Sequence, residues 1–375
     1  MQVCDVDLSI VIPVYNAEMW IERAVLSAVY SYSGAMEVIC VDDGSTDGSP
    51  DILSRLAEEY QCVKVLRQEN KGRSAARNLG IHHARGTWIG FLDADDSVLP
   101  DAFDKVLSRS TGDVGLICFL AQKSMRQATD LFARKTEIDP SASVHFDSGS
   151  ALQFLSDPAY YLAKNAISDD VKSVLSVFDA LWCWTVFSKL FNASKLREAD
   201  VHFEEGLKFG EDVLFVHEYL SQAKCDVAFF PITTHIYNVE NPGTTRGYST
   251  GDVGRLLATF KAFASRVLAS KYPEELAWRC VEDMLFVSVR AAKYCIKSEG
   301  QQEILQGFYD ETLLDFCGML EKDRFRKMGS SVWPIWAWAF RSLKSGAFQS
   351  YWYACRVMGC LERLVEMTRQ KSDRK

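Results

Sequence analysis

Three carboxylates within four residues, Asp93-Ala94-Asp95-Asp96, are the strongest chemical signal in the chain. They follow the apolar run Trp88–Leu92, whose composition predicts a buried strand. Carboxylates this close repel one another unless a cation lies between them. Open α/β sheets bind ligands at the carboxyl ends of their strands. Because hard oxygen ligands select Mg²⁺ or Mn²⁺, and substrate phosphates commonly complete such sites, the tetrad indicates a metal–phosphate site; a solvated acidic turn is the alternative.

A second chemical signal lies in Ser9–Asn16, where an apolar strand ends in Pro13, Val14, Tyr15 and Asn16. Proline has no N–H to give to a neighbouring strand, so we expect Pro13 at the strand end. Tyr15 then leaves the sheet at the edge where ligands bind. An aromatic ring there can stack on a nucleobase, although an ordinary strand-capping turn would explain the same residues.

The segment Val41–Ser49 carries a third signal, two adjacent carboxylates followed by Gly44. Gly44 permits a tight turn, and the Ser, Thr and Asp residues behind it can cap a helix. A capped loop accounts for these residues but not for Asp42 and Asp43. A carboxylate at this position can accept a hydrogen bond from the imide of uracil or from a ribose hydroxyl.

Several functional classes are excluded by what the sequence lacks. No G-x-G-x-x-G follows the first strand and no G-x-x-x-x-G-K-[ST] occurs, which argues against a dehydrogenase and a P-loop NTPase. The net charge of -8 argues against nucleic acid as a partner, since nucleic-acid-binding domains are typically basic.

The elements that must position these residues alternate between strand and helix. Four strands and three helices are predicted up to residue 92, which implies an α/β fold built on a mainly parallel sheet. Further strands are predicted later in the chain, the last of them ended by Pro231, and from residue 251 the pattern is helical. The predicted strands are Leu8–Val14, Met36–Val41, Cys62–Leu66, Thr87–Leu92, Asp113–Leu120 and Cys225–Phe230, and the helices are Trp20–Tyr32, Asp51–Tyr60 and Ser74–Ala84.

The composition of the 375 residues, 48% hydrophobic and 25% charged, is that of a globular protein with two or three domains. Its 11 cysteines form no C-x-x-C, and the acidic N-terminus lacks a signal-peptide core, so we expect a cytoplasmic location. Residues 322–375 hold 12 Lys or Arg against 4 Asp or Glu, with Trp and Tyr interspersed. This tail is either a peripheral membrane surface facing anionic lipid or a helical subdomain packed internally.

Taken in order, four blocks resemble the nucleotide-sugar domain of family 2 glycosyltransferases: Ser9–Asn16, Val41–Ser49, Asn70–Asn78 and Phe91–Asp96. The resemblance is tight over residues 8–105, looser to about 245, and does not reach the C-terminal third. It implies the Rossmann-like GT-A fold. The domains expected from it are the nucleotide-sugar half, residues 1–110, the acceptor half, residues 111–250, and a helical C-terminal region with the basic aromatic tail, residues 251–375.

The resemblance assigns roles to matching donor-side residues. Tyr15 and Asp43 would line the base pocket, and the arginines of the third block would lie near the donor phosphates, although Arg77 could equally be a structural helix residue. Asp93 and Asp95 match the D-x-D motif, Asp93 meeting the ribose or sugar and Asp95 binding Mn²⁺ or Mg²⁺. The full donor-binding set is Pro13, Tyr15, Asn16, Asp43, Arg73, Arg77, Asp93, Ala94 and Asp95.

An inverting sugar transfer needs a general base on the acceptor hydroxyl, and Asp212 in Phe209–Phe215 matches the family's Glu-Asp motif. A plain acidic helix start would also explain Glu211 and Asp212. The acceptor side is expected to include Trp182, Trp184, Lys189 and Glu211. His235 is a candidate second metal ligand, although a single histidine is more often structural, and Asn241–Arg246 resembles a loop that closes over the donor.

These residues predict a metal-dependent inverting glycosyltransferase. It would move a sugar from a nucleotide-diphospho-sugar, with a UDP-sugar as the expected donor, to a glycan or lipid-linked acceptor in surface polysaccharide synthesis. The alternative is a nucleotide-sugar-binding partner without turnover in a glycan-assembly complex.

Overall fold

The fold is described from a computed structural model in which the chain divides into two compact units, Met1–Asn241 and Pro242–Lys375. The structure describes residues 6–110, 113–123, 142–156, 162, 165, 167–175, 185–207, 210–238 and 262–269. Among these, residues 262–269 are a helical stretch of the second unit, and the rest of the predicted helical region and basic tail lies outside the described residues. The three-part domain division stays a prediction. No helix in the described part of the chain has the length and hydropathy of a membrane span.

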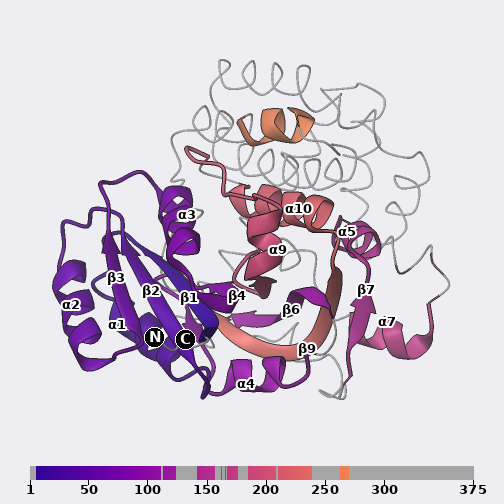
Figure 1. Cartoon of the computed structure of the whole chain (residues 1–375), viewed down its shortest axis with the longest axis horizontal. Coiled ribbons are helices and arrows are strands. Elements are labelled where there is room, and N and C mark those ends of the chain that lie inside the picture. Colours follow the sequence, from indigo (N-terminus) through magenta and orange to yellow (C-terminus); the bar gives the residue numbers. More distant parts are fainter. Residues whose placement is uncertain are drawn as a thin grey trace, which may run out of the picture. The chain divides into compact units, whose positions relative to one another are not determined.

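In the described residues of the first unit, nine strands form one sheet whose order is β3-β2-β1-β4-β8-β6-β9-β5, with β7 paired to β9 (Figure 1). The strands are β1 (Val6–Val14), β2 (Met36–Asp42), β3 (Val63–Arg67), β4 (Gly86–Phe91), β5 (Ser97–Val98), β6 (Val114–Lys123), β7 (Val144–Phe146), β8 (Lys189–Asn192) and β9 (Asp226–Tyr237). The helices are α1 (Ile21–Val29), α2 (Ser49–Glu59), α3 (Arg73–His83), α4 (Ala102–Leu107), α5 (Ser148–Ser156), α7 (Asp169–Leu175), α9 (Ala193–Glu198) and α10 (Glu211–Ala223).

The four strands β3, β2, β1 and β4 run parallel, as the alternation of strands and helices predicted. Beyond β4 the sheet becomes mixed, because β8 pairs antiparallel with both β4 and β6. The α/β expectation is therefore confirmed, and the parallel half of the sheet brings the ends of β1, β2 and β4 to one edge.

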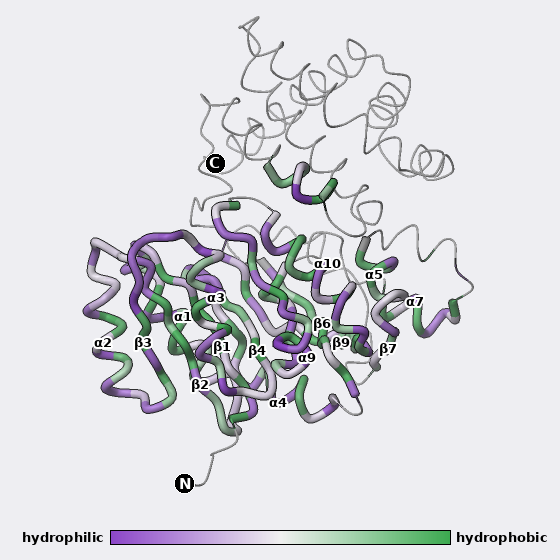
Figure 2. Tube along the Cα trace, turned by 45° about the horizontal axis from the view of Figure 1, so that its top comes forward, coloured by the Kyte–Doolittle hydropathy of each residue, from purple (hydrophilic) through white to green (hydrophobic). Residues whose placement is uncertain are grey.

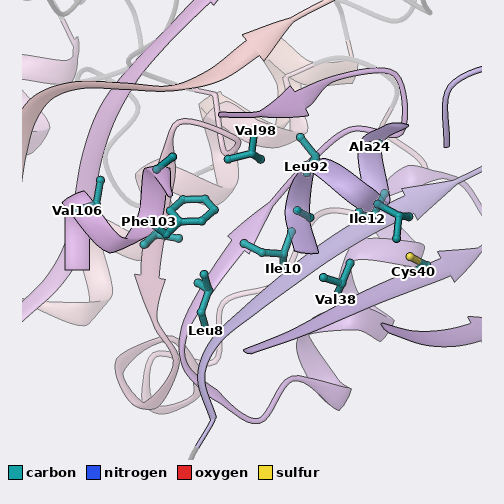
Figure 3. Packing of buried hydrophobic residues seen from close by; sticks show 14 of the residues in the cluster. Leu8, Ile10, Ile12, Ala24, Val38, Cys40, Leu92, Val98, Phe103 and Val106 are labelled. Carbon is teal, nitrogen blue, oxygen red and sulfur yellow. The ribbon is translucent and has the colours of Figure 1, made fainter. Parts of the chain in front are cut away.

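Side chains of β1 alternate between two buried layers, as the period of two in a strand requires. Leu8, Ile10 and Ile12 join one core cluster with residues of α1, α2 and α4 (Figure 3). Val11 faces the opposite way, against α3, where a Cβ on Gly80 would lie 2.3 Å from the Val11 side chain. Helices thus cover both faces of the parallel strands, and this explains their nearly continuous apolar sequences.

Hydropathy along the chain follows the same layering (Figure 2). The central strands are mostly hydrophobic, whereas hydrophobic and hydrophilic residues alternate along α2. Within α2, Leu53 and Leu56 are fully buried and Arg55 lies outside with Glu22 and Glu59. Alpha-helical spacing therefore predicted this helix correctly.

One prediction about the last strand is wrong. β9 does not end before Pro231 but continues through it to Tyr237, so His235 lies inside the strand and not beyond it. Cys118 of β6 pairs with Phe229 of β9, but Leu120 pairs with Thr233, so the register shifts between these two pairs. Pro231 lies within the shifted stretch of β9. A proline is tolerated within a strand at such an irregularity because its missing N–H falls where the ladder is already broken.

Candidate active site

The carboxyl ends of β1, β2 and β4 lie together, because Val14 pairs with Asp42 and Val11 with Phe91 in parallel register. Pro13, predicted at the strand end, is the penultimate residue of β1 and is buried opposite Val41. The three chemical signals of the sequence therefore meet at one edge.

The loops that follow β1 and β2 hold each other in place. Asn16 has a positive φ of 49°, a conformation that asparagine tolerates, and its Oδ1 accepts a hydrogen bond from the Thr46 backbone N–H at 2.8 Å. In return, the Asn16 N–H donates to Ser45 Oγ at 3.0 Å. Gly44 has φ 74°, which confirms the tight turn. Tyr15 beside them is 51% exposed, so its ring faces the solvent side of this edge.

Asp43 is buried and ties the end of β2 to the loop that precedes α3. Its Oδ1 accepts hydrogen bonds from Gln68 Nε2 at 2.7 Å and the Lys71 N–H at 2.8 Å, and its Oδ2 accepts one from the Gly72 N–H at 2.8 Å. An ionised carboxylate has about four acceptor positions, so these three bonds leave room for one further donor.

The acidic tetrad places its carboxylates in different surroundings. Asp93 is partly buried, and its Oδ1 accepts a hydrogen bond from Arg77 Nη2 at 2.8 Å. Burial raises the pKa of Asp93, but the charges of Arg77 and Arg73 outweigh burial and lower it overall. Asp95 is half-buried, and its backbone carbonyl accepts a hydrogen bond from Arg23 at 2.6 Å. This arginine on α1 therefore fixes the turn that carries the tetrad.

Asp96 points inward and plays a structural part. It is 1% exposed, and its Oδ1 accepts a hydrogen bond from the Asn238 N–H at 2.7 Å. Burial, with the neighbouring charge of Asp93, raises the pKa of Asp96 to about 9. Asp96 therefore joins the tetrad to the end of β9.

Arg77 lies at the centre of the site. Its side chain is 1% exposed, and its guanidinium reaches three carboxylates. Nη1 donates to Asp212 Oδ1 at 2.6 Å and lies 3.4 Å from Glu211 Oε1, while Nη2 donates to Asp93. Burial lowers the pKa of Arg77, but the three carboxylates outweigh it and raise it overall. An arginine in this setting is permanently charged and is shielded from solvent.

Asp212 and Glu211 begin α10, after Gly210 with its positive φ of 77°. Burial and the charge of Glu211 raise the pKa of Asp212 to about 6, while Arg77 opposes them. Glu211 is 3% exposed and forms ion pairs with Arg77 and, at 2.5 Å, with Arg73. The Glu-Asp pair is thus a charged cluster in contact with α3 and not an isolated acidic helix start.

Of the four residues predicted on the acceptor side, the structure describes Lys189 and Glu211. Trp182 and Trp184 lie outside the described residues, as does Asn241–Arg246. Lys189 is 1% exposed, and its Nζ donates to the Thr185 carbonyl at 2.7 Å and to Ser188 Oγ at 3.3 Å. Its ammonium group therefore stabilises the turn that precedes β8.

His235 is buried among aromatic rings. It stacks on Phe119 with a centroid distance of 5.4 Å and meets Phe103 edge-on at 5.9 Å. Nδ1 shares a hydrogen bond of 2.8 Å with Thr234 Oγ1. Burial lowers the pKa of His235 to about 3, so the ring is neutral. Its role as a metal ligand stays a prediction.

Two positioning residues were missed by the sequence analysis. Arg23 had no recognisable signal, because nothing in α1 indicates a contact across the sheet edge. Asn78 stood in the third block: it donates from Nδ2 to the Phe203 carbonyl at 2.9 Å and accepts from the Phe203 N–H at 2.8 Å. Its place in the third block, directly after Arg77, is the signal that could have identified it.

The donor set at the end of β4 fits a divalent cation only in part. Asp93 uses one oxygen for Arg77, and in the described part of the chain no hydrogen bond is recorded to the other. Asp95 lies two residues further on. No group of three or more His, Cys, Asp or Glu able to hold a metal occurs among the described residues. A divalent ion at this edge would need further oxygens to complete its coordination, and its binding stays a prediction.

Residues 9–137 match the family model described as Glycosyl transferase family 2. This part of the chain is therefore similar to glycosyltransferase family 2.

Curated relatives agree with this assignment. The chain is 28% identical over 208 residues to the uncharacterized glycosyltransferase EpsJ of Bacillus subtilis, covering 56% of this chain and 54% of that one. It is 40% identical over 106 residues to the uncharacterized glycosyltransferase YibD of Escherichia coli, covering 28% and 31%. It is 25% identical over 261 residues to the succinoglycan biosynthesis protein ExoO of Rhizobium meliloti, covering 69% and 68%. The matches thus span about half or less of the first two relatives.

Among solved structures, the chain is similar to residues 1–349 of TarS from S. aureus, crystallised in complex with UDP-GlcNAc. The TM-score is 0.62 at 15% sequence identity, and the match covers 93% of this chain and 90% of that one. This likeness supports the GT-A fold.

Proposed function

We propose that the chain is an inverting glycosyltransferase that moves a sugar from a nucleotide-diphospho-sugar to a hydroxyl of a glycan or lipid-linked acceptor. The observation that carries the proposal is the pair of contacts made by Arg77. It binds Asp212, the matching position for the general base, at 2.6 Å and Asp93, of the D-x-D motif, at 2.8 Å. One guanidinium therefore joins the candidate acceptor side to the candidate donor side.

In the proposed mechanism, Asp212 accepts the proton of the acceptor hydroxyl as that oxygen attacks the anomeric carbon. A pKa of about 6 leaves the carboxylate ionised at neutral pH and raises its proton affinity above that of an exposed aspartate. Asp93 would orient the ribose or sugar. Mn²⁺ or Mg²⁺, held by Asp95, would supply positive charge to the leaving diphosphate.

The identity of the donor and the biological setting are part of the proposal. A UDP-sugar is proposed because the TarS fragment of similar fold is crystallised with UDP-GlcNAc. Surface polysaccharide synthesis is proposed because the relative ExoO is a succinoglycan biosynthesis protein. Residues 322–375, with their excess of Lys and Arg over Asp and Glu, could bring the enzyme to an anionic cytoplasmic membrane face and so to a lipid-linked acceptor.

Thermal unfolding with nucleotides tests the donor site. Wild type and Asp95→Ala are compared with Mn²⁺ plus UDP, GDP, CDP or dTDP. A ligand at about 100 times its dissociation constant adds roughly 2.7 kcal/mol, or about 2–4 °C in a chain of this length. We expect a Mn²⁺-dependent rise with UDP that Asp95→Ala loses. A folded protein that responds to none of the four nucleotides would contradict the donor-site assignment.

Sugar transfer is then measured with the nucleotide-sugars of the nucleotide that binds, as donor hydrolysis and as transfer to glycan acceptors. If the donor nucleotide binds but no sugar is transferred to any acceptor tested, the result would favour the non-catalytic alternative, a nucleotide-sugar-binding partner in a glycan-assembly complex.

A further inference from the structure

Arg77 poses a problem that the proposed function leaves open. A positive charge in the third sequence block was expected near the donor phosphates, yet the Arg77 side chain is 1% exposed and is surrounded by three carboxylates. Burying a charged group is costly unless each of its donors is used. Arg73, at 36% exposure, is the arginine of this block with access to solvent.

The fork of the Arg77 guanidinium fixes two carboxylates relative to each other. Nη1 binds Asp212 and Nη2 binds Asp93, so the distance between these side chains is set by one rigid planar group. A lysine at this position has a single ammonium nitrogen and cannot hold both in the same arrangement.

The guanidinium packs against the ring of Phe203, which is itself held by residues of α3 and α10. The guanidinium carbon lies 5.1 Å from the centroid of the Phe203 ring. Asn78, the next residue on α3, holds the Phe203 backbone by two hydrogen bonds, and the Phe203 ring stacks on Phe215 of α10 at 3.9 Å. The Phe203 ring therefore packs against a guanidinium whose two terminal nitrogens bind Asp212 and Asp93.

We propose that Arg77 is a positioning residue that aligns the general base Asp212 with the sugar-binding Asp93, and that the negative charge of Glu211 opposes the effect of the Arg77 charge on Asp212. This inference rests on the proposed function for its kinetic consequences. Glu211 touches both Arg73 and Arg77, so it lies where its charge opposes that of Arg77 on Asp212.

The two partners act on Asp212 in opposite directions. The Arg77 charge lowers the pKa of Asp212, whereas the Glu211 charge raises it. Removing the charge of Arg77 should move the acidic limb of the kcat/KM profile to higher pH, and removing that of Glu211 should move it to lower pH. A residue that only supports packing has no reason to produce shifts of opposite sign.

The kinetic test uses the full chain with the variants Arg77→Gln, Arg77→Lys and Glu211→Gln, assayed between pH 5 and 8. Arg77→Lys keeps the charge but loses the fork, and we expect kcat to fall about 100-fold with a much smaller change in donor KM, the cost of a misplacement of about 1 Å. Arg77→Gln should shift the acidic limb upward and Glu211→Gln downward. Full kcat in Arg77→Lys, or limbs that shift in the same direction, would overturn the proposal.

Matched controls separate these effects from general changes in charge or stability. Glu218→Gln removes one carboxylate from the exposed face of the same helix α10, and Arg55→Gln removes one arginine charge on α2, where its partners are Glu22 and Glu59. In both control variants we expect the acidic limb of the kcat/KM profile to stay at its wild-type pH. A limb shift in a control as large as that in its partner variant would count against a local effect.

A second readout does not depend on turnover. The ¹³C resonance of the Asp212 carboxyl, assigned by its absence in Asp212→Asn, is titrated in wild type, Arg77→Gln and Glu211→Gln. Opposite shifts support the coupling even if no transfer is found, in which case the proposed function fails and the electrostatic link stands. If Arg77→Gln does not fold, Glu211→Gln alone decides, since an unchanged or raised Asp212 pKa in that variant overturns the inference.

Discussion

At the scale of single residues, the site is governed by an uneven balance of charge. Two arginines, Arg73 and Arg77, face three carboxylates, Asp93, Glu211 and Asp212. Burial, followed by the charge of Glu211, raises the pKa of Asp212 to about 6, whereas the charges of Arg77 and Arg73 outweigh burial at Asp93 and lower its pKa. Carboxylates whose environments move their pKa values apart are suited to different roles, which in our proposal are proton acceptance by Asp212 and donor binding by Asp93.

We predict that Asp212→Asn lowers kcat of sugar transfer by about 100-fold to 10,000-fold, because the amide cannot accept the acceptor proton. Donor binding should change by less than about 3-fold, since Asp93 and Asp95 remain. Initial rates and calorimetric titration of the donor measure the two effects. Turnover retained in Asp212→Asn, with Glu218→Gln as the reference, would remove the base assignment.

The motifs made Asp93, Asp95 and Asp212 candidate site residues, and their roles stay predictions, but the sequence could not tell what Arg77 contacts. Whether an arginine faces phosphate or protein depends on burial, and burial of Arg77 is produced by Phe203 and Glu211, more than 120 positions away in the chain. Local residue types carry no record of such a contact. The same limit applies to Lys189, expected on the acceptor side and found buried against its own turn.

At the scale of elements, the loops of the candidate site follow β1, β2 and β4. Away from that site, these strands are joined by a network of hydrogen bonds centred on Glu37. Glu37, 2% exposed in β2, accepts hydrogen bonds from Ser9 Oγ at 2.7 Å and Lys64 Nζ at 2.5 Å, and from the Arg85 N–H at 2.6 Å. Ser9 Oγ in turn accepts from the Gly86 N–H at 2.8 Å. One carboxylate therefore links β1, β2, β3 and the start of β4.

We predict that Glu37→Gln destabilises the protein by about 1–3 kcal/mol, the usual cost of leaving buried charged partners without their hydrogen bonds. Burial raises the pKa of Glu37, but Lys64, Ser9 and the Arg85 N–H outweigh it and lower the folded value below 4.5. Because the folded pKa is depressed, the stabilisation is complete above pH 4.5 and is lost as the pH falls through the folded pKa.

Urea denaturation of wild type and Glu37→Gln at pH 7 and pH 4 measures this difference. Glu59→Gln is the matched control, since Glu59 forms an ion pair with Arg55 in solvent, where such pairs contribute little to stability. A difference between wild type and Glu37→Gln that grows on acidification would contradict the assignment.

Elements with strong periodicity were predicted within one to three residues, as for α3, predicted at Ser74–Ala84 and found at Arg73–His83. β9 was predicted too short because proline normally ends a strand. The register shift against β6 that accommodates Pro231 is a property of the pair of strands, and no single-strand pattern contains it.

At the scale of the whole molecule, the described contacts of the candidate site all lie within the first compact unit, Met1–Asn241. That unit has its own buried core on both faces of the sheet. An independent core is the condition for a domain to fold by itself. The whole predicted helical region, residues 251–375, with its basic tail belongs to the second unit, Pro242–Lys375, and the family resemblance does not extend beyond about residue 245.

We predict that the fragment 1–241 folds and keeps Mn²⁺-dependent binding of the nucleotide diphosphate that the full chain binds. Tyr15, Asp43, Asp93 and Asp95 are all present in it, so the expected loss of affinity is less than about 10-fold. Calorimetric titration of fragment and full chain, after circular dichroism has verified cooperative unfolding of the fragment, makes the comparison. A cooperatively folded fragment without affinity, beside a full chain that binds, would mean that residues after 241 complete the donor site. The first unit would then be a scaffold for the donor carboxylates, and the second unit would supply part of the recognition.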